Sequence, residues 1–389
     1  MKDIWLAGRV VLPDGIQEQG SVLVSNGRIA ALNGSCPENA EPVWTRGTIL
    51  PGFIDIHVHG GGDADCMDNT PEAILQMAKT HCTHGTTAMV PTTMTCEDKL
   101  LCQVIDCFGQ ARKFQTEGAT LLGLHLEGPY FSAAGKGAQP VVAQRVPVRE
   151  TLEAVLERGK GDILRWDMSP ELAGFDVFAR VCEEWGVMPA VAHTQATADE
   201  ALAAFDSGFC HVTHFYNATS TFHKKNGIVY SGVVEATYLR DDVTIELIGD
   251  GRHIPKQSMQ LALRIKGPDK ICLITDSMRA AGVNTTHSIL GARDSGVPVI
   301  IKDDVAQLTD LSAYAGSICT MDRALRVAHL EYGLPLEDVS RMLSATPARL
   351  CGLEKTKGKI AKGYDADLVV MDENFRVKST YVKGVCQHP

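Results

Sequence analysis

Two histidines at positions 57 and 59 have the spacing of a metal-binding edge. They end an apolar run, Pro-Gly-Phe-Ile-Asp-Ile-His-Val-His, which begins at residue 51 and stops at three glycines. Such a run predicts a β-strand, in which side chains alternate between two faces. His57 and His59 therefore point the same way and can share one ion, although the pair alone is equally typical of two hydrogen-bonded, partly buried histidines.

Four further short apolar runs end in a histidine or a carboxylate, and five such runs are hard to ascribe to chance. The additional end residues are Glu127, His193, His214 and Asp276. Glu127, His193 and His214 supply the one carboxylate and two imidazoles that catalytic zinc and iron sites favour while leaving a position for water. His57 and His59 could hold a second ion beside that set.

Hydrolysis of an amide is the chemistry that this pattern favours. A divalent ion lowers the pKa of its water from about 16 to about 7. Asp276 is the carboxylate expected to take the proton and return it to the leaving amine. His125 and His211 are expected to be hydrogen-bonded histidines of the interior. No role is expected for the other histidines on helical or loop stretches, which are His81, His84, His287 and His329.

The order of the predicted elements indicates an α/β fold. Between residues 51 and 354, apolar strand-like runs alternate with helical stretches, which means a parallel sheet. Seven or eight such repeats favour a (β/α)₈ TIM-like barrel of the metal-dependent hydrolase type, with the reacting groups at the carboxyl ends of its strands. A β-hairpin insertion is predicted near residues 288–310. Residues 1–50 and 355–389 are strand-like and are expected to share a small β-sandwich domain formed by both termini.

Composition narrows the possible partners and location. The 389 residues carry 47 acidic and 37 basic side chains, a formal charge of −10, and no basic block of the kind that binds nucleic acid. The first residues resemble neither a signal peptide nor a membrane span. We therefore expect a soluble, cytoplasmic protein without a nucleic-acid or membrane partner. The twelve cysteines are scattered and are expected to be free thiols.

The chain resembles the N-acetylglucosamine-6-phosphate deacetylases of the amidohydrolase superfamily through ordered motifs along nearly its whole length. These are PGFIDIHVHGGG at 51–62, HGTTAMVPTT at 84–93, HLEGPYFS at 125–132, KGAQ at 136–139, AHT at 192–194, THFYNA at 213–218, DGRH at 250–253, ITDSMRAAG at 274–282, AGSICTMDRALR at 315–326 and GKIAKGYDADLVVMD at 358–372. The resemblance implies a metal-dependent barrel with a flanking β domain, removal of acetate from the 2-amino group of the sugar phosphate, and a homodimer.

Site roles follow from the same resemblance, residue by residue. Glu127, His193 and His214 match the primary metal ligands, and Asp276 matches the catalytic acid/base. His57 and His59 match the pair for a second metal, so that one or two ions, zinc or iron by preference, are expected. The resemblance also implies substrate-binding roles for Asn217, Ala218 and His253.

One segment departs from the family pattern. Members usually carry an Arg-Glu-Pro-Gly stretch whose arginine reaches the substrate phosphate across the dimer, whereas this chain has His-Lys-Lys-Asn-Gly at 223–227. Lys225, or Lys224 if the count runs backward from Gly227, takes the arginine position. A lysine neutralises phosphate as a point charge but lacks the planar two-pronged contact. N-acetylgalactosamine 6-phosphate, an unphosphorylated N-acetyl amino sugar and an N-acyl amino acid therefore remain alternative substrates, and a scaffold without catalysis is a third reading.

Overall fold

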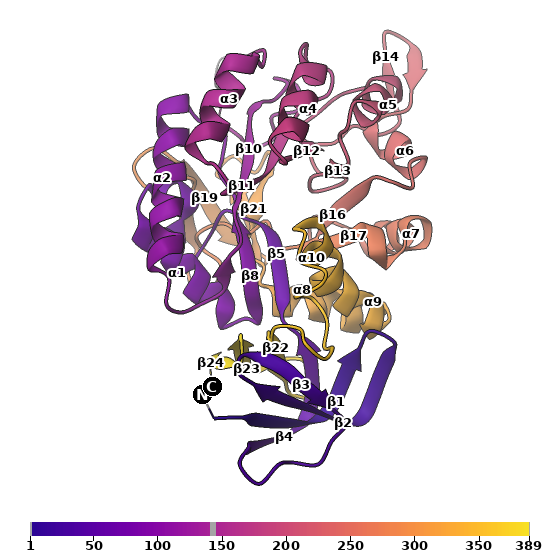
Figure 1. Cartoon of the computed structure of the whole chain (residues 1–389). Coiled ribbons are helices and arrows are strands. Elements are labelled where there is room, and N and C mark those ends of the chain that lie inside the picture. The colour runs from indigo at the N-terminus through magenta and orange to yellow at the C-terminus, as the bar shows by residue number, and fades with distance from the viewer. Residues whose placement is uncertain (1, 141–144, 389) are drawn as a thin grey trace.

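A large barrel and a smaller β domain make up the chain, and both termini lie in the smaller unit (Figure 1). The computed structural model describes residues 2–140 and 145–388, and the side chain of Lys225 lies outside this description.

Eight parallel strands form the barrel within the described residues. They are β5 (Phe53–Val58), β8 (Thr86–Pro91), β10 (Leu124–Tyr130), β11 (Ile163–Met168), β12 (Met188–Val191), β13 (His211–Val212), β16 (Thr244–Ile248) and β17 (Ile271–Ile274). The last six pair in this order, and β5 pairs with β8. Parallel bridges between Thr92 and His125 and between Val58 and Ser277 close the ring. The predicted (β/α)₈ barrel is confirmed.

A helix follows each of these strands and packs outside the barrel. The helices are α1 (Pro71–Cys82), α2 (Asp98–Phe114), α3 (Arg149–Arg158), α4 (Phe175–Glu184), α5 (Ala198–Asp206), α6 (Val233–Tyr238), α7 (Lys256–Lys266) and α8 (Met321–Arg326). Capping side chains mark the starts of α1 and α5. The Thr70 side chain accepts a hydrogen bond from the Ala73 N–H at the start of α1, and Thr197 and Glu200 form a capping box at α5. Two short helices, α9 (Leu336–Ser340) and α10 (Thr346–Leu350), complete the set.

The β domain is one seven-stranded sheet that joins the two ends of the chain. Its order is β24-β23-β22-β4-β1-β2-β3. The strands are β1 (Ile4–Leu12), β2 (Gly15–Ser25), β3 (Arg28–Leu32), β4 (Glu41–Pro51), β22 (Leu368–Met371), β23 (Val377–Val382) and β24 (Val385–His388). A bridge from Arg28 to Asp365 brings β3 back toward the start of β22. The sheet thus folds over its own apolar core, which includes Leu6, Val22, Ile49 and Leu368.

Four antiparallel strands follow β17 in the segment for which a hairpin near residues 288–310 is predicted. They are β18 (His287–Leu290), β19 (Val297–Lys302), β20 (Val305–Leu308) and β21 (Tyr314–Ser317). The insertion is therefore wider than a single hairpin. A parallel bridge between Ser277 and Ser317 attaches it beside the end of β17, so the insertion borders the mouth of the barrel.

The segment that departs from the family pattern forms a separate hairpin. Its strands β14 (His223–Lys225) and β15 (Ile228–Tyr230) are joined by Asn226 and Gly227, both at positive φ. Figure 1 shows this hairpin projecting from the barrel beyond α5 and α6. The remaining short strands are β6 (Gly60–Gly61), β7 (Ala64–Asp65) and β9 (Thr120–Leu121). Among the described residues no helix is long and apolar enough to cross a membrane; the cytoplasmic location stays a prediction.

Candidate active site

Six predicted metal and acid/base residues meet at one end of the barrel. His57 lies near the end of β5, Glu127 lies in the middle of β10, and the other four follow the ends of strands. Those four are His59, His193, His214 and Asp276. All six are at most 7% exposed. Because the carboxyl ends of parallel strands open onto one mouth, residues far apart in sequence converge there.

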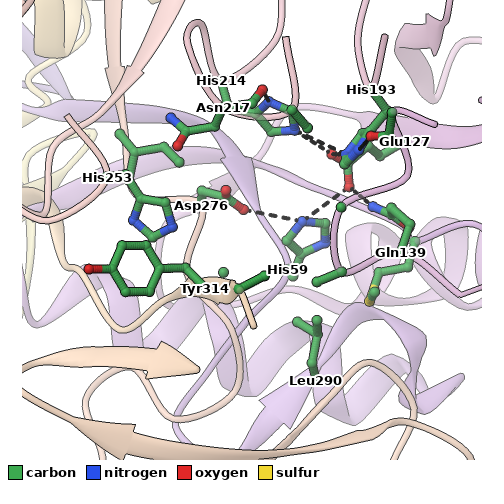
Figure 2. Close-up of a pocket in the computed structure, with 18 of the residues that line it drawn as sticks. His59, Glu127, Gln139, His193, His214, Asn217, His253, Asp276, Leu290 and Tyr314 are labelled. Carbon is green, nitrogen blue, oxygen red and sulfur yellow. Dashed lines mark hydrogen bonds and ion pairs between the residues drawn. The ribbon is translucent and has the colours of Figure 1, made fainter. Parts of the chain in front are cut away.

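Glu127, His193 and His214, here named the first cluster, have three donor atoms in mutual contact. The Nε2 atoms of both histidines lie 3.0 Å from the same Glu127 Oε1 and 3.1 Å from each other (Figure 2). The outer ring nitrogens are already used. Nδ1 of His193 donates to the Gly135 carbonyl and Nδ1 of His214 to the Asn217 carbonyl, each at 3.0 Å.

That hydrogen-bond pattern fits a bound cation. A carbonyl oxygen can only accept, so Nδ1 of each histidine carries the proton and Nε2 presents a lone pair in the neutral ring. The two Nε2 atoms and Glu127 Oε1 then face one another with lone pairs and no proton between them. A positive charge must stabilise this arrangement. Two imidazoles and one carboxylate are the donor set of catalytic zinc and iron sites, and the groups that hold their outer nitrogens are typical of such sites.

His57, His59 and Asp276, here named the second cluster, form a further group of three donors. Asp276 Oδ1 lies 3.3 Å from His59 Nε2 and 3.5 Å from His57 Nε2. Glu127 links the two clusters, because its Oε2 atom lies 3.3 Å from His59 Nε2 while Oε1 faces the first cluster. The predicted second-metal pair thus lies directly beside the first set, with one carboxylate between them.

The charge of the site is reflected in its pKa values. Burial lowers the pKa of His214 and of His59, but facing carboxylates more than offset it and raise both to about 9: Glu127 for His214, and Asp276 with Glu127 for His59. Burial likewise raises the pKa of Asp276, yet His57 and His59 hold it below its usual range. The carboxylates attract positive charge, so a proton competes with a metal ion and metal affinity should fall as the pH falls.

Backbone conformation at the site is strained. His193, His214 and Asp276 have φ values of 47°, 30° and 47°, in the left-handed region that residues other than glycine rarely adopt. Each such residue costs of the order of 1–3 kcal/mol and is found where the surrounding structure holds it for function. Each of the three residues follows the end of a different strand, and its side chain faces the mouth of the barrel.

A pocket of about 340 Å³ opens above the two clusters. Asn217, Ala218 and His253, the residues predicted to bind substrate, all line it. Nδ1 of His253 donates to the Asp250 carboxylate at 2.7 Å, and its ring packs against Tyr314 (Figure 2). Nε2 of His253 has no hydrogen bond to the described residues and is available to a ligand in the pocket. The Asn217 amide nitrogen is buried and has no hydrogen-bond partner among the described residues. It is a donor available to a ligand.

Lys224, in the segment that departs from the family pattern, lies outside the pocket. It is exposed in β14, and the main chain of Lys225 pairs with Ile228. Lys224 is not among the residues that line the pocket. Within the described residues that line the pocket, there is no lysine or arginine.

Sequence reasoning missed several residues that contact the metal-site donors. Gln139 belongs to the quoted KGAQ motif but was assigned no role; its amide donates to Glu127 Oε2 at 2.5 Å and accepts from the Thr95 N–H at 2.9 Å. Glu246 and Arg165 are charged residues inside mostly apolar strands, a signal that could have identified them. His125 bonds Asp167 at 2.8 Å and belongs to neither cluster.

Replacing Gln139 with leucine is expected to weaken metal binding by about 10-fold, at the lower end of the roughly 10–100-fold typical of partners that orient metal ligands. The change removes the donor that fixes Glu127 Oε2 while keeping the side-chain volume. Metal affinity would be measured by competition with a chromophoric chelator. Gln195→Leu is the matched control, because Gln195 lines the same pocket; equal affinities of the two variants would contradict the assigned contact.

Comparison with known proteins places the fold and the site in one family. The model of the amidohydrolase family matches residues 48–386. An N-acetylglucosamine-6-phosphate deacetylase from Lysinibacillus sphaericus is 32% identical, with 96% of this chain and 95% of the relative covered. An N-acetylgalactosamine-6-phosphate deacetylase from Escherichia coli O157:H7 is 28% identical, with 99% of each covered.

A solved structure agrees over the full chain. It is an aspartate-to-alanine mutant of N-acetyl-D-glucosamine-6-phosphate deacetylase from Mycobacterium smegmatis in complex with N-acetyl-D-glucosamine-6-phosphate, with a TM-score of 0.91, 28% identity and 100% of both chains covered. The deacetylase from Pasteurella multocida has a TM-score of 0.91 at 25% identity, also with complete coverage. The chain therefore belongs to the amidohydrolase family, within the N-acetylglucosamine-6-phosphate deacetylase group.

Proposed function

We propose that this protein is a metal-dependent deacetylase that hydrolyses N-acetylglucosamine 6-phosphate to glucosamine 6-phosphate and acetate. The observation that carries the proposal is the set of six donors at the mouth of the barrel, in two clusters that Glu127 links. The names of the relatives indicate the substrate, and the donor set indicates metal-dependent hydrolysis as the class of reaction. Zinc or iron, with one or two ions per subunit, suits imidazole and carboxylate donors.

The first cluster would hold one ion, and the second cluster would hold another. A divalent ion bound at these clusters would lower the pKa of its water, so that hydroxide is available near neutral pH, and it would polarise the acetyl carbonyl. Asp276, which belongs to the second cluster and also lines the pocket, takes a proton from the attacking water. It then hands that proton to the sugar nitrogen as the carbon–nitrogen bond breaks, so that a neutral amine and acetate leave.

The residues that line the pocket would orient the substrate. The free Asn217 amide and the main chain at Ala218 would bind the sugar phosphate, and Nε2 of His253 would bind the substrate near the acetamido group. The ring of Tyr314 and the apolar side chains of Met94 and Leu290 border the same space. These groups exclude water from one side of the sugar while the amide faces the donors.

A homodimer would supply a positive charge that the described lining residues of the pocket do not provide. A phosphate of charge near −2 needs a cationic partner in or beside the pocket, and the described lining residues contain no lysine or arginine. The β14–β15 hairpin projects from the barrel and carries exposed apolar side chains at Phe222, Ile228 and Val229. We propose that this hairpin packs on a second copy, so that the partner subunit's Lys225 or Lys224 reaches the phosphate.

Replacing Lys224 and Lys225 together with alanine is expected to raise KM for the phosphorylated substrate by about 10–100-fold, with kcat little changed. That range corresponds to the roughly 1.5–3 kcal/mol of a hydrogen bond to a charged group. Activity on unphosphorylated N-acetylglucosamine should stay the same. Lys113→Ala, which removes an exposed lysine from α2, is the control. A monomer in sedimentation at micromolar concentration would contradict the supply of charge by a second subunit.

Acetate release from a panel of amides tests the substrate. The panel holds N-acetylglucosamine 6-phosphate, N-acetylgalactosamine 6-phosphate, unphosphorylated N-acetylglucosamine and an N-acyl amino acid. The highest kcat/KM is expected for the first. The galacto isomer is the second candidate, because a relative named for that substrate matches over 99% of the chain. Preference for the unphosphorylated sugar or the amino acid would refute the proposed substrate while leaving metal-dependent hydrolysis in place.

A further inference from the structure

The interior of the barrel behind the two clusters is ionic rather than apolar. Barrels of this kind are normally filled by branched apolar side chains. Here the described residues place six titratable side chains there, each at most 2% exposed: Asp55, His125, Arg165, Asp167, His211 and Glu246. Burying such groups costs free energy that apolar side chains of similar volume avoid. Their presence calls for a role that apolar residues cannot fill.

Glu246, in the middle of β16, has contacts with both clusters. Its Oε2 atom accepts a hydrogen bond from Nδ1 of the His57 ring at 3.0 Å and another from the main-chain N–H of His214 at 3.1 Å. Its Oε1 atom pairs with the Arg165 guanidinium and lies 3.4 Å from Nε2 of His211. One oxygen therefore contacts a ligand side chain of the second cluster and the main chain that carries a ligand of the first.

We propose that Glu246, anchored by Arg165, is the positioning residue that ties the two donor clusters together. By accepting the Nδ1 proton of His57, it turns Nε2 of that ring toward His59 and Asp276 as a lone-pair donor. By accepting the N–H of His214, it helps hold the main chain of that residue, whose φ of 30° is strained. The two sites are thus coupled through one side chain.

A carboxylate is required for this arrangement. The ring N–H of His57 and the main-chain N–H of His214 both donate to Oε2 of Glu246, and the Arg165 guanidinium, which is permanently charged, pairs with Oε1. A carboxylate has acceptors on both sides, whereas an amide has an acceptor on only one. With glutamine, the NH₂ group would face either Arg165 or the His57 and His214 donors. In the second orientation the His57 proton would move to Nε2, where it blocks metal binding.

Glu246→Gln tests the inference by a measurement that needs no substrate. The purified full-length protein would be stripped with a chelator and titrated with Zn²⁺, with binding read by chelator competition and by elemental analysis. We expect the variant to bind Zn²⁺ at least about 10-fold more weakly, with the loss greatest for the ion held by the second cluster. Glu246→Asp keeps the charge opposite Arg165 but withdraws the carboxylate by one methylene, and a smaller loss in the same direction is expected.

Asp167→Asn is the matched control. Asp167 is also a buried carboxylate that faces Arg165, at 3.4 Å, but its other contact is His125, which is not in either cluster. Its Zn²⁺ affinity should stay within about twofold of the wild type. Equal weakening in Asp167→Asn and Glu246→Gln would overturn the inference, since the effect would then belong to the ionic interior in general. Unchanged binding in both Glu246 variants would also overturn it.

The inference rests on the proposed function, because it assumes that the clusters bind metal. The two can fail separately. A wild-type protein that binds no divalent ion would overturn both, whereas a wild-type protein that binds Zn²⁺ with the same affinity as Glu246→Gln would overturn only the positioning role. Thermal unfolding of the stripped proteins provides the check that each variant is folded.

Discussion

Replacing Asp276 with asparagine is expected to lower kcat for acetate release by about 10³-fold, within the roughly 10²–10⁴-fold that a positioned acid or base contributes. Asparagine has nearly the same shape but cannot take a proton from water or return one to the amine. His57 and His59 hold the pKa of Asp276 below its usual range although burial raises it, so the native carboxylate is ionised and able to accept a proton at neutral pH.

The readout for Asp276→Asn combines turnover with metal content. The ion held by Glu127, His193 and His214 should remain, because Asp276 belongs to the other cluster. Asp322→Asn is the control, since Asp322 is a buried carboxylate that pairs with His84 and Arg326 and does not line the pocket. A variant at position 276 with near-normal kcat would remove Asp276 as the proton shuttle.

Glu127→Gln is expected to abolish turnover by removing metal from both clusters. Partners that merely orient a ligand are worth roughly 10–100-fold in metal affinity, so loss of the shared ligand should cost more than about 100-fold. The Glu127 carboxylate contacts His193 and His214 through Oε1 and His59 through Oε2. The amide keeps the volume but loses the charge and one acceptor.

Metal content by elemental analysis, together with circular dichroism, measures the effect of Glu127→Gln. The expected result is a folded protein with little bound metal and no acetate release. Excess metal should restore little activity, because the bridging charge is absent. Full metal occupancy in this variant would show that Glu127 is not a shared ligand, and the two clusters would then have to be treated as independent.

The sequence predicts that the candidate donors converge, and the structure brings them together in two groups, for a physical reason. Strand ends in a parallel barrel meet at one mouth, so residues such as His193, His214 and Asp276 can be recognised from short apolar runs alone. The parallel barrel itself follows from the alternation of strands and helices. Which donor contacts which depends on side-chain distances, and these do not follow from periodicity.

Contacts made by loops and by the barrel interior were less predictable. Gln139 lies in a stretch without regular periodicity, so nothing local indicates its bond to Glu127. Glu246 is a charged residue within a buried strand and could have been noticed, but its partners Arg165 and His57 are 81 and 189 residues away. The insertion after β17 contains four strands where alternation suggested one hairpin, because its short strands are separated by turns that the pattern does not distinguish from loops.

The role of residues 223–227, the segment that departs from the family pattern, also could not be predicted from the sequence. Its sequence, His-Lys-Lys-Asn-Gly, indicates only a counterpart of the phosphate-binding stretch of the family, and the structure has a hairpin there. Among the described side chains of this hairpin, Lys224 does not line the pocket of its own subunit. A contact between Lys224 and the substrate therefore depends on a second copy of the chain, which a single sequence does not describe.

Stoichiometric formation of acetate and glucosamine 6-phosphate from N-acetylglucosamine 6-phosphate, by protein of known metal content, tests the central claim most directly. The reaction should give one acetate per amine, stop when the metal is removed by a chelator, and resume when Zn²⁺ or Fe²⁺ is added back. Undiminished hydrolysis by the metal-free protein, or no hydrolysis of any member of the amide panel by the metal-loaded protein, would contradict it.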